Sequence, residues 1–224
     1  MRILHEDRDV IVIDKAAGLL VQDLQRGERT VEGALSEYVR KGQAKSRRRV
    51  YLVHRLDRDT SGVMVVAKTA EAQEYFRSRW NEITEKTYLA RVAGTMPEQE
   101  GCFESYLAED ADGYRVRSVK DVEKGRLART EWTVLSKSRG TALVRVVLRS
   151  GRKNQIRVHF AEAGHPVVGD VKYGGRPSSA GLCLHAWRLA FIHPHTGKKL
   201  FFETALPAFA APSRSSTTSR EPMK

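Results

Sequence analysis

The chain has 224 residues, of which 39 are lysine or arginine and 27 are aspartate or glutamate, so its formal net charge is +12. Its hydrophobic fraction of 41% is too high for a disordered basic tail, and two cysteines are too few for a disulfide-stapled secreted scaffold. No apolar run approaches the roughly 18 residues of a membrane span, and the charged start MRILHEDRDV excludes a signal peptide. We therefore expect a cytoplasmic globular protein, and the positive charge favours a polyanionic partner.

The first part of the sequence predicts short strands and two capped helices. Apolar runs of strand type lie at residues 3–4, 10–13, 63–67 and 87–92. After Thr30 and again after Thr69, apolar residues recur at helical spacing. Threonine is a good N-cap, so a helix is predicted to begin after each of these two residues.

The second part is richer in strands, and it decides the fold class. Strands are predicted at residues 130–135, 142–148, 182–192 and 200–202, and one helix is predicted to begin at Asn154 and end at Gly164. Strands outnumber helices and hairpin-length connections are common, which favours an α+β fold with a mostly antiparallel mixed sheet over a doubly wound parallel one. We expect one folded domain over residues 1–206 and a disordered tail over residues 207–224.

The loop HRLDRDTSG, between two apolar runs, is the main candidate site. It places Asp57 between Arg55 and Arg58, and nearby arginines keep a carboxylate ionised. A buried strand on each side would hold this acid rigidly at a surface cleft. The alternative is an ordinary turn, in which Asp59 and Thr60 cap the backbone and Asp57 pairs with Arg55 or Arg58.

This loop resembles the signature HRLDxxTSG of the RluA-type pseudouridine synthases at every fixed position. Four other segments are similar to family motifs and occur in the family's order: ILHEDRDVIVIDKAAGLLV, EKTY, SGRKNQIRVHFAEAGHPVVGDVKYGG and LHAWRLAFIHPHTGKKLFF. The resemblance covers roughly residues 2 to 207. It implies a pseudouridine synthase fold over residues 1–206, with the active-site cleft across a central sheet that helices and loops flank.

The resemblance also implies an activity, the isomerisation of specific uridines in ribosomal or transfer RNA without a cofactor. By motif position Asp57 is the catalytic aspartate, which either attacks C1′ as a nucleophile or abstracts a ribose proton to give a glycal. Tyr88 then lies against the target base, and Arg157 pairs with Asp57. Without the motif, the sequence pattern would predict that Tyr88 is a core residue and that Arg157 is a surface residue.

The resemblance assigns further residues to the substrate. The predicted substrate-binding residues are His54, Arg55, Thr60, Ser61, Lys153, Asn154 and Gln155. Among these, Arg55 would occupy the space that an extruded base leaves. Lys153 and Asn154 replace the family's usual Thr-His, so they affect selectivity more than catalysis. Asn154 is the better helix cap, and Lys153 could add a phosphate contact.

Residues 40–49 read RKGQAKSRRR, with six basic residues in ten and no acid. A run of this kind is commonly a solvated loop. Because it comes directly before the strand that enters the candidate site, we hypothesise that it binds the RNA backbone through Lys45, Arg47, Arg48 and Arg49.

Other site types fit the sequence less well. His159 with His165, and His193 with His195, lack a cysteine or acidic ligand at a suitable spacing, so no metal site is predicted. Asp57 and Asp59 are too close in sequence to span the ~5–9 Å of a glycosidase acid pair.

Two alternative functions stay open at this point. One is a non-catalytic RNA-binding or ribosome-assembly factor that retains the fold, and the other is a nucleoside glycosidase. In the leading interpretation the protein is a monomer that binds RNA and needs no cofactor, metal or membrane.

Overall fold

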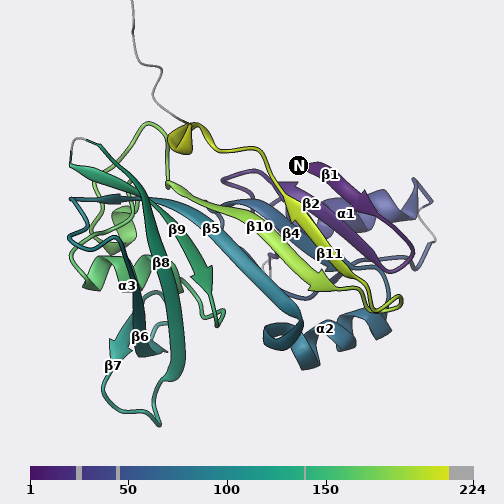
Figure 1. Ribbon diagram of the computed structural model, residues 1–224. Helices are drawn as coiled ribbons and strands as arrows, with labels where there is room; N and C mark the ends of the chain where they lie inside the picture. Colours follow the sequence, from purple (N-terminus) through teal and green to yellow (C-terminus); the bar gives the residue numbers. More distant parts are fainter. Residues whose placement is uncertain (24–26, 44–45, 139, 212–224) are drawn as a thin grey trace, which may run out of the picture.

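The computed structural model describes residues 1–23, 27–43, 46–138 and 140–211. Within these residues, eleven strands form one sheet in the order β1-β2-β4-β10-β5-β9-β8-β6-β7, with β3 beside β4 and β11 beside β10 (Figure 1). The strands are β1 (Arg2–Glu6), β2 (Val10–Lys15), β3 (Tyr51–Leu52), β4 (Ser61–Ala67), β5 (Thr84–Ala93), β6 (Glu100–Glu109), β7 (Val116–Val119), β8 (Arg126–Ser138), β9 (Thr141–Leu148), β10 (Leu184–Ile192) and β11 (Lys199–Glu203).

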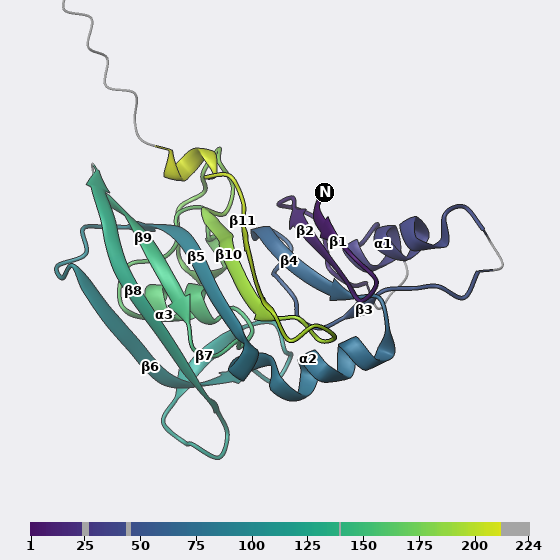
Figure 2. The ribbon, with the colours of Figure 1, turned by 45° about the vertical axis from the view of Figure 1, so that its right-hand side comes forward.

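Three α-helices and two short 3-10 helices accompany the sheet. They are α1 (Val31–Arg40), α2 (Ala70–Ile83), α3 (Gln155–Glu162), η1 (Val171–Tyr173) and η2 (Ala208–Ala210). Figures 1 and 2 show α1 near the β1–β2 end of the sheet and α3 near the β6–β8 end. None of the described helices is long and apolar enough to span a membrane.

The predicted α+β class with a mostly antiparallel sheet is confirmed. Among the described strands, β4 and β10 are parallel and the other pairs are antiparallel. The predicted N-caps of α1 and α2 are also confirmed, because the hydroxyl of Thr30 accepts from Gly33 N at 3.0 Å and that of Thr69 accepts from Ala72 N at 3.1 Å.

The β6–β7 hairpin was not predicted from the sequence. In β6 exposed and partly buried residues alternate over most of the strand, but charged and small side chains interrupt its apolar ones. This pair lies at the edge of the sheet, where only a few residues, such as Leu107 and Val116, are buried. A strand that buries so few side chains leaves a weak period-two signal.

Two hydrophobic cores pack against the sheet, one in each half. The first surrounds β2 and β4 and includes Ile11, Met64 and Phe76, the last from α2. The second lies between β5, β9 and α3 and includes Val146 and Phe160. Tyr88 of β5 packs against both cores, so it marks the boundary between the halves.

β10 joins the two halves through a narrow contact. It pairs with β4 only where His185 meets Ser61 and Ala186 meets Gly62, and on its other side Ala186 pairs with Tyr88. Gly62 has a φ of +114°, and a Cβ built there would lie 2.1 Å from the carbonyl oxygen of Ala186. Glycine therefore allows β4 to approach β10, and it brings the loop before β4 within two strand spacings, about 10 Å, of Tyr88.

The disordered tail was predicted to begin at residue 207, but the residues directly after this position are folded. Ala208–Ala210 form η2, and Arg91 Nε of β5 donates to the carbonyl oxygen of Phe209 at 3.0 Å. Because Ala210 is also buried, this segment is packed against the sheet. The rest of the predicted tail, residues 212–224, lies outside the described residues.

The β4–β10 junction generates a prediction about stability. Gly62→Ala should lower the free energy of unfolding by about 3 kcal/mol or more, since the added methyl meets backbone that cannot turn aside. The control is Gly197→Ala, where φ is +66° and a Cβ would meet nothing within 4 Å; its cost should be only about 1 kcal/mol. Urea denaturation of the two variants measures the difference, and equal costs would contradict a close contact at this junction.

Candidate functional site

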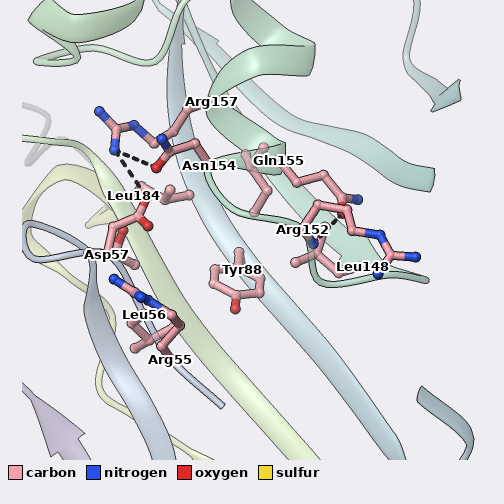
Figure 3. Close-up of a pocket in the computed structure, with 12 residues that line it drawn as sticks. Arg55, Leu56, Asp57, Tyr88, Leu148, Arg152, Asn154, Gln155, Arg157 and Leu184 are labelled. Carbon is pink, nitrogen blue, oxygen red and sulfur yellow. Dashed lines mark hydrogen bonds and ion pairs between the residues drawn. The ribbon is translucent and has the colours of Figure 1, made fainter. Parts of the chain in front are cut away.

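A pocket opens where the loop before β4, strand β5 and the N-terminus of α3 meet (Figure 3). Its volume is about 370 Å³, and it is open to solvent. It is lined by Arg55, Leu56, Asp57, Thr60, Tyr88, Leu148, Arg152, Asn154, Gln155, Ile156, Arg157 and Leu184. The structure therefore brings together Asp57, Tyr88 and Arg157, the three residues expected to be catalytic.

Asp57 and Arg157 form an ion pair within this pocket. Arg157 Nη1 lies 3.0 Å from Asp57 Oδ2, although the two residues are 100 positions apart in sequence. The Asp57 side chain is 24% exposed and that of Arg157 is 13% exposed. A carboxylate in this position is accessible to a ligand and held in one orientation by a largely buried cation.

Asp170, a residue with no role predicted from the sequence, anchors the same arginine. Its fully buried carboxylate accepts from Arg157 Nε and Nη2, each at 2.7 Å. Burial by itself would lower the pKa of Arg157, but the hydrogen bonds and charge of Asp170, with a contribution from Asp57, outweigh burial and raise it. Arg157 is therefore a permanent cation clamped from one side, with one nitrogen left for Asp57.

Asn154 has a different role from the predicted one. It precedes α3, as expected, but its φ is +53° and its side chain makes no capping hydrogen bond, so the cap prediction is wrong. Instead, Asn154 Oδ1 accepts from Arg157 Nη1 at 3.1 Å, and its Nδ2 donates to the Tyr173 hydroxyl at 2.9 Å. The amide orients the nitrogen that contacts Asp57, and the left-handed backbone is one that asparagine tolerates.

Lys15 holds the loop that carries Asp57. Its fully buried ammonium donates to the carbonyl oxygens of Ala16, Leu19 and Arg58 at 2.8–3.0 Å. Burial lowers its pKa to about 8, although the charges of Asp59 and Asp57 act in the opposite direction. In the sequence this lysine follows a buried strand and looks like an ordinary turn residue, because its three acceptors become apparent only after folding.

The alternative in which Asp57 pairs with Arg55 or Arg58 is wrong. Arg58 Nε donates to the Gly18 carbonyl oxygen at 3.2 Å, and its terminal nitrogens contact Glu28. Arg55 is exposed, and its guanidinium has no partner among the described residues, although it lines the pocket. Asp57 therefore takes its partner from α3 rather than from its own loop.

Tyr88 lies beside this ion pair on β5 (Figure 3). Desolvation raises the pKa of its phenol, and the negative charge of Asp57 raises it further. At neutral pH the hydroxyl is therefore protonated and can donate or accept a hydrogen bond. Because Tyr88 also packs against both hydrophobic cores, its ring has a fixed position in the pocket.

Thr60 and Gln155 also line the pocket, but they differ in what they can offer a ligand. All four hydrogen bonds of the Gln155 amide are made within the protein, and its partners are Ser150, Arg152, Arg129 and Thr130. The hydroxyl of Thr60 is buried and has no partner within the described structure. Gln155 is thus positioned to hold the wall of the pocket, whereas Thr60 has an unused polar atom.

Three predicted substrate-binding residues lie outside the pocket lining. His54 stacks on Trp80 with ring centroids 4.5 Å apart; burial and the nearby Lys86 lower its pKa to about 3, so its neutral Nε2 accepts from Val65 N at 3.1 Å. The Ser61 hydroxyl bonds to the His185 ring at 2.8 Å.

Lys153 is the third of these residues, and its charge is already compensated. Its Nζ lies 2.5 Å from Glu109 Oε2 and 2.6 Å from the Gly113 carbonyl oxygen. The phosphate contact suggested for it would have to compete with a carboxylate. Arg152, the residue before it, was not expected at the site but lines the pocket.

The predicted backbone-binding residues lie in part around another hollow. Arg48 and Arg49 line it together with Arg8, Lys41 and Lys68, and it also contains Glu6. Lys68 is paired with Glu6 at 2.7 Å. Arg47 is exposed outside this lining, and Lys45 lies outside the described residues.

A second group of polar residues has the composition of a metal site. Potential ligand atoms of Asp7, Asp9 and His193 lie within 4.8 Å of one another. Both nitrogens of His193 are engaged, since Nδ1 accepts from the backbone of His195 and Thr196 and Nε2 contacts Asp7 Oδ2 at 3.0 Å. Through the contact between His193 and Asp7, this group connects the β1–β2 turn with the β10–β11 turn.

The clamp on Arg157 predicts a measurable stability effect. Asp170→Asn keeps the shape of the side chain but leaves Arg157 without its buried counter-ion, so the free energy of unfolding should fall by about 3 kcal/mol. The control is Asp121→Asn, which removes a carboxylate that is 46% exposed and paired with Lys124; its cost should be below about 1 kcal/mol. Urea denaturation measures both, and a near-neutral Asp170→Asn would rule out the clamp as a stabilising element.

The chain is similar in sequence to curated proteins from bacteria. The chain is 38% identical over 219 residues to the ribosomal large subunit pseudouridine synthase D of Nitrosomonas europaea, across 92% of this chain and 62% of that protein. It is 35% identical over 214 residues to the uncharacterized RNA pseudouridine synthase YlyB of Bacillus subtilis, across 92% and 69%. The chain thus spans less than two thirds of the length of the first relative.

Solved structures and a family model give the same assignment. The structure titled Human RNA Pseudouridylate Synthase Domain Containing 4 superposes with a TM-score of 0.72 at 28% identity, covering 93% of this chain and 89% of that chain. The RNA pseudouridylate synthase family model matches residues 9–162. With a match across more than half of its length, the chain belongs to the RNA pseudouridylate synthase family.

Proposed function

We propose that this protein is an RNA pseudouridine synthase that isomerises specific uridines in structured RNA. The observation that carries the proposal is the contact between Asp57 and Arg157 in a pocket that Tyr88 also lines. A single ionised carboxylate, oriented and partly exposed, is what this isomerisation needs from the protein. The family membership agrees with the geometry.

The reaction breaks the bond between N1 and C1′ and forms a bond between C5 and C1′. The C5 proton is lost and N1 gains one, so atoms and charge balance without an external reagent. Asp57 acts on the ribose, either as a nucleophile at C1′ or as a base that leads to a glycal, and both routes require its carboxylate to be ionised. Arg157 contacts Asp57 Oδ2 and leaves Oδ1 without this contact, so it fixes which oxygen faces the substrate.

The pocket wall suits the rotation of a freed uracil. Leu56, Leu148, Ile156 and Leu184 supply apolar surface that limits the access of water. The Tyr88 phenol, neutral at working pH, lies against the base and can assist a proton transfer. The unpartnered Thr60 hydroxyl is a further hydrogen-bonding group for the substrate, since a buried polar atom without a partner is costly unless a ligand satisfies it.

Arg55 has the properties expected of a side chain that enters the space of an extruded base. It is exposed at the pocket, and its guanidinium is not committed to any described residue. A planar cation can stack on the neighbouring bases, which offsets part of the few kcal/mol that base extrusion costs. Accessible loops and bulges are the cheapest substrates for such a step.

The RNA substrate is proposed to be ribosomal or transfer RNA, in which case the protein acts in the cytoplasm. One relative is named a ribosomal large subunit pseudouridine synthase, which favours large-subunit RNA as the first substrate to test. The experiment is to incubate the purified chain with unmodified transcripts of large-subunit RNA and of transfer RNAs. Pseudouridine is then mapped by selective chemical derivatisation and reverse transcription.

Asp57→Asn should abolish pseudouridine formation, with a rate at least about 10³-fold lower, because the amide can neither attack C1′ nor accept the ribose proton. The matched control is Asp59→Asn in the same loop, which removes the same charge from an exposed residue outside the pocket and should keep activity. If Asp57→Asn gave the native pseudouridine pattern, the enzymatic proposal would fail and the RNA-binding alternative would replace it. Release of free uracil would instead indicate a glycosidase.

We also propose that the basic segment before β3 binds the RNA backbone. The support is the hollow at Arg48 and Arg49, where Arg8, Lys41 and Lys68 add positive charge and Glu6 is already paired with Lys68. Several cations around one hollow, with one compensated acid, favour a phosphate backbone over a solvated loop.

Charge reversal of Arg47, Arg48 and Arg49 should therefore weaken RNA binding and flatten its dependence on salt. In the control, the charges of Lys137, Arg145 and Lys198 are reversed, which gives the same change in net charge. These three residues are exposed elsewhere on the molecule. Fluorescence anisotropy with a labelled substrate stem-loop, titrated at several salt concentrations, compares the two triple variants. An equal loss of affinity in both would mean that only overall charge matters.

A further inference from the structure

A further hollow lies next to the pocket that holds Asp57 and Tyr88, called the base pocket below. It is lined by Leu107, Ala108, Glu109, Val116, Lys124, Arg126, Gly151, Arg152 and Lys153, and its volume is about 890 Å³ compared with about 370 Å³ for the pocket. Arg152 belongs to both linings. In Figure 3, Arg152 lies on the side of Tyr88 that faces away from Asp57. The hollow therefore borders the site at Arg152, on the wall opposite the carboxylate.

The charge of this hollow is strongly positive. Four of its lining residues are lysine or arginine and one, Glu109, is acidic. The Glu109 carboxylate is compensated by Lys153 at 2.5 Å, so the remaining cations are not balanced within the lining. The neighbouring ion pair of Lys124 with Asp121 is largely exposed, and such pairs are weak.

Two arginines in the hollow have unused donors. Arg152 Nε donates to the Leu127 carbonyl oxygen at 3.1 Å, which fixes the side chain and leaves its terminal nitrogens without a partner among the described residues. The Arg126 guanidinium has no partner among the residues that the structure describes. A guanidinium held by one nitrogen presents the others as a fork, the geometry that matches two oxygens of a phosphate.

We propose that this hollow binds the phosphodiester backbone of the RNA strand next to the target uridine. Arg152 is the residue at which the strand passes from the base pocket into the hollow, and Lys124 and Arg126 then contact the phosphates that follow. Lys153 does not contact phosphate but holds Glu109 away from it. The inference rests on the proposed function, since it assumes that the base pocket takes a uridine of RNA.

The experiment changes two residues that do not line the base pocket. Lys124→Ala combined with Arg126→Ala is compared with Lys137→Ala combined with Lys198→Ala, which has the same net charge. Lys137 lies at the far end of β8 from Arg126, about 35 Å along the strand, and Lys198 lies in the β10–β11 turn. Two probes are used: the transcript segment that the native chain modifies and a 20-nucleotide oligouridylate.

The first variant should bind both probes about tenfold more weakly, and its slope of log affinity against log salt should fall by about 1.4, since each phosphate contact to a single strand contributes about 0.7. The kcat/KM of this variant should fall because its KM rises, while its kcat stays the same. The control pair should change affinity by less than about twofold. Equal losses in the two variants, or no loss in the first, would overturn the proposal.

Phosphate ethylation interference gives a readout that a folding defect cannot mimic. Ethylation of one or two phosphates beside the target uridine should reduce binding of the native chain and should have no effect on the Lys124→Ala, Arg126→Ala variant. Interference that persists in this variant would refute the assignment. If the native chain forms no pseudouridine, the proposed function fails, whereas the oligouridylate arm still tests whether the hollow binds RNA.

Discussion

The position of one guanidinium sets the geometry of the site. Arg157 donates two hydrogen bonds to the buried carboxylate of Asp170 and one to the amide oxygen of Asn154, and its Nη1 also donates to Asp57. A buried charge is tolerable only when its partners are in place, so the loop that carries Asp170 and the start of α3 must adopt their observed conformations together. Gly169 contributes to this, because a Cβ there would lie 1.9 Å from the Gly181 carbonyl oxygen.

This arginine also links two halves of the molecule that pack separately. Asp57 comes from the half built around β2 and β4, and Arg157 comes from the helix that covers β5, β8 and β9. Within the sheet, β4 pairs with β10 at only two positions, beside the loop that carries Asp57. The geometry of the pocket therefore depends on how the two halves pack together, and the ion pair across the pocket helps to set it.

The sequence allowed the fold class and the N-caps of α1 and α2 to be predicted, and the motif around Asp57 directed attention to the pocket, because each has a local signature. Strand and helix periods, a capping threonine and the motif around Asp57 are all contained in short segments. The roles of Asp170 and Lys15 were not predictable in this way, since their partners are brought to them only by folding. Asn154 was placed correctly but assigned the wrong partner, because its amide bonds to Arg157 rather than to the helix backbone.

The way in which β4 is covered has a consequence for synthesis on the ribosome. One edge of this strand is paired with β2, and the other is shared by β3, the His54 ring at Val65, and β10 at the start of the strand. His185 of β10 follows Ser61 by 124 residues, so β4 emerges long before its last partner. A bare strand edge invites pairing with other chains. β3 and His54 come shortly before β4 in the sequence, so they can cover most of this edge of β4 as soon as β4 has been synthesised. Only the end of β4 beside Asp57 stays unpaired until β10 has been synthesised.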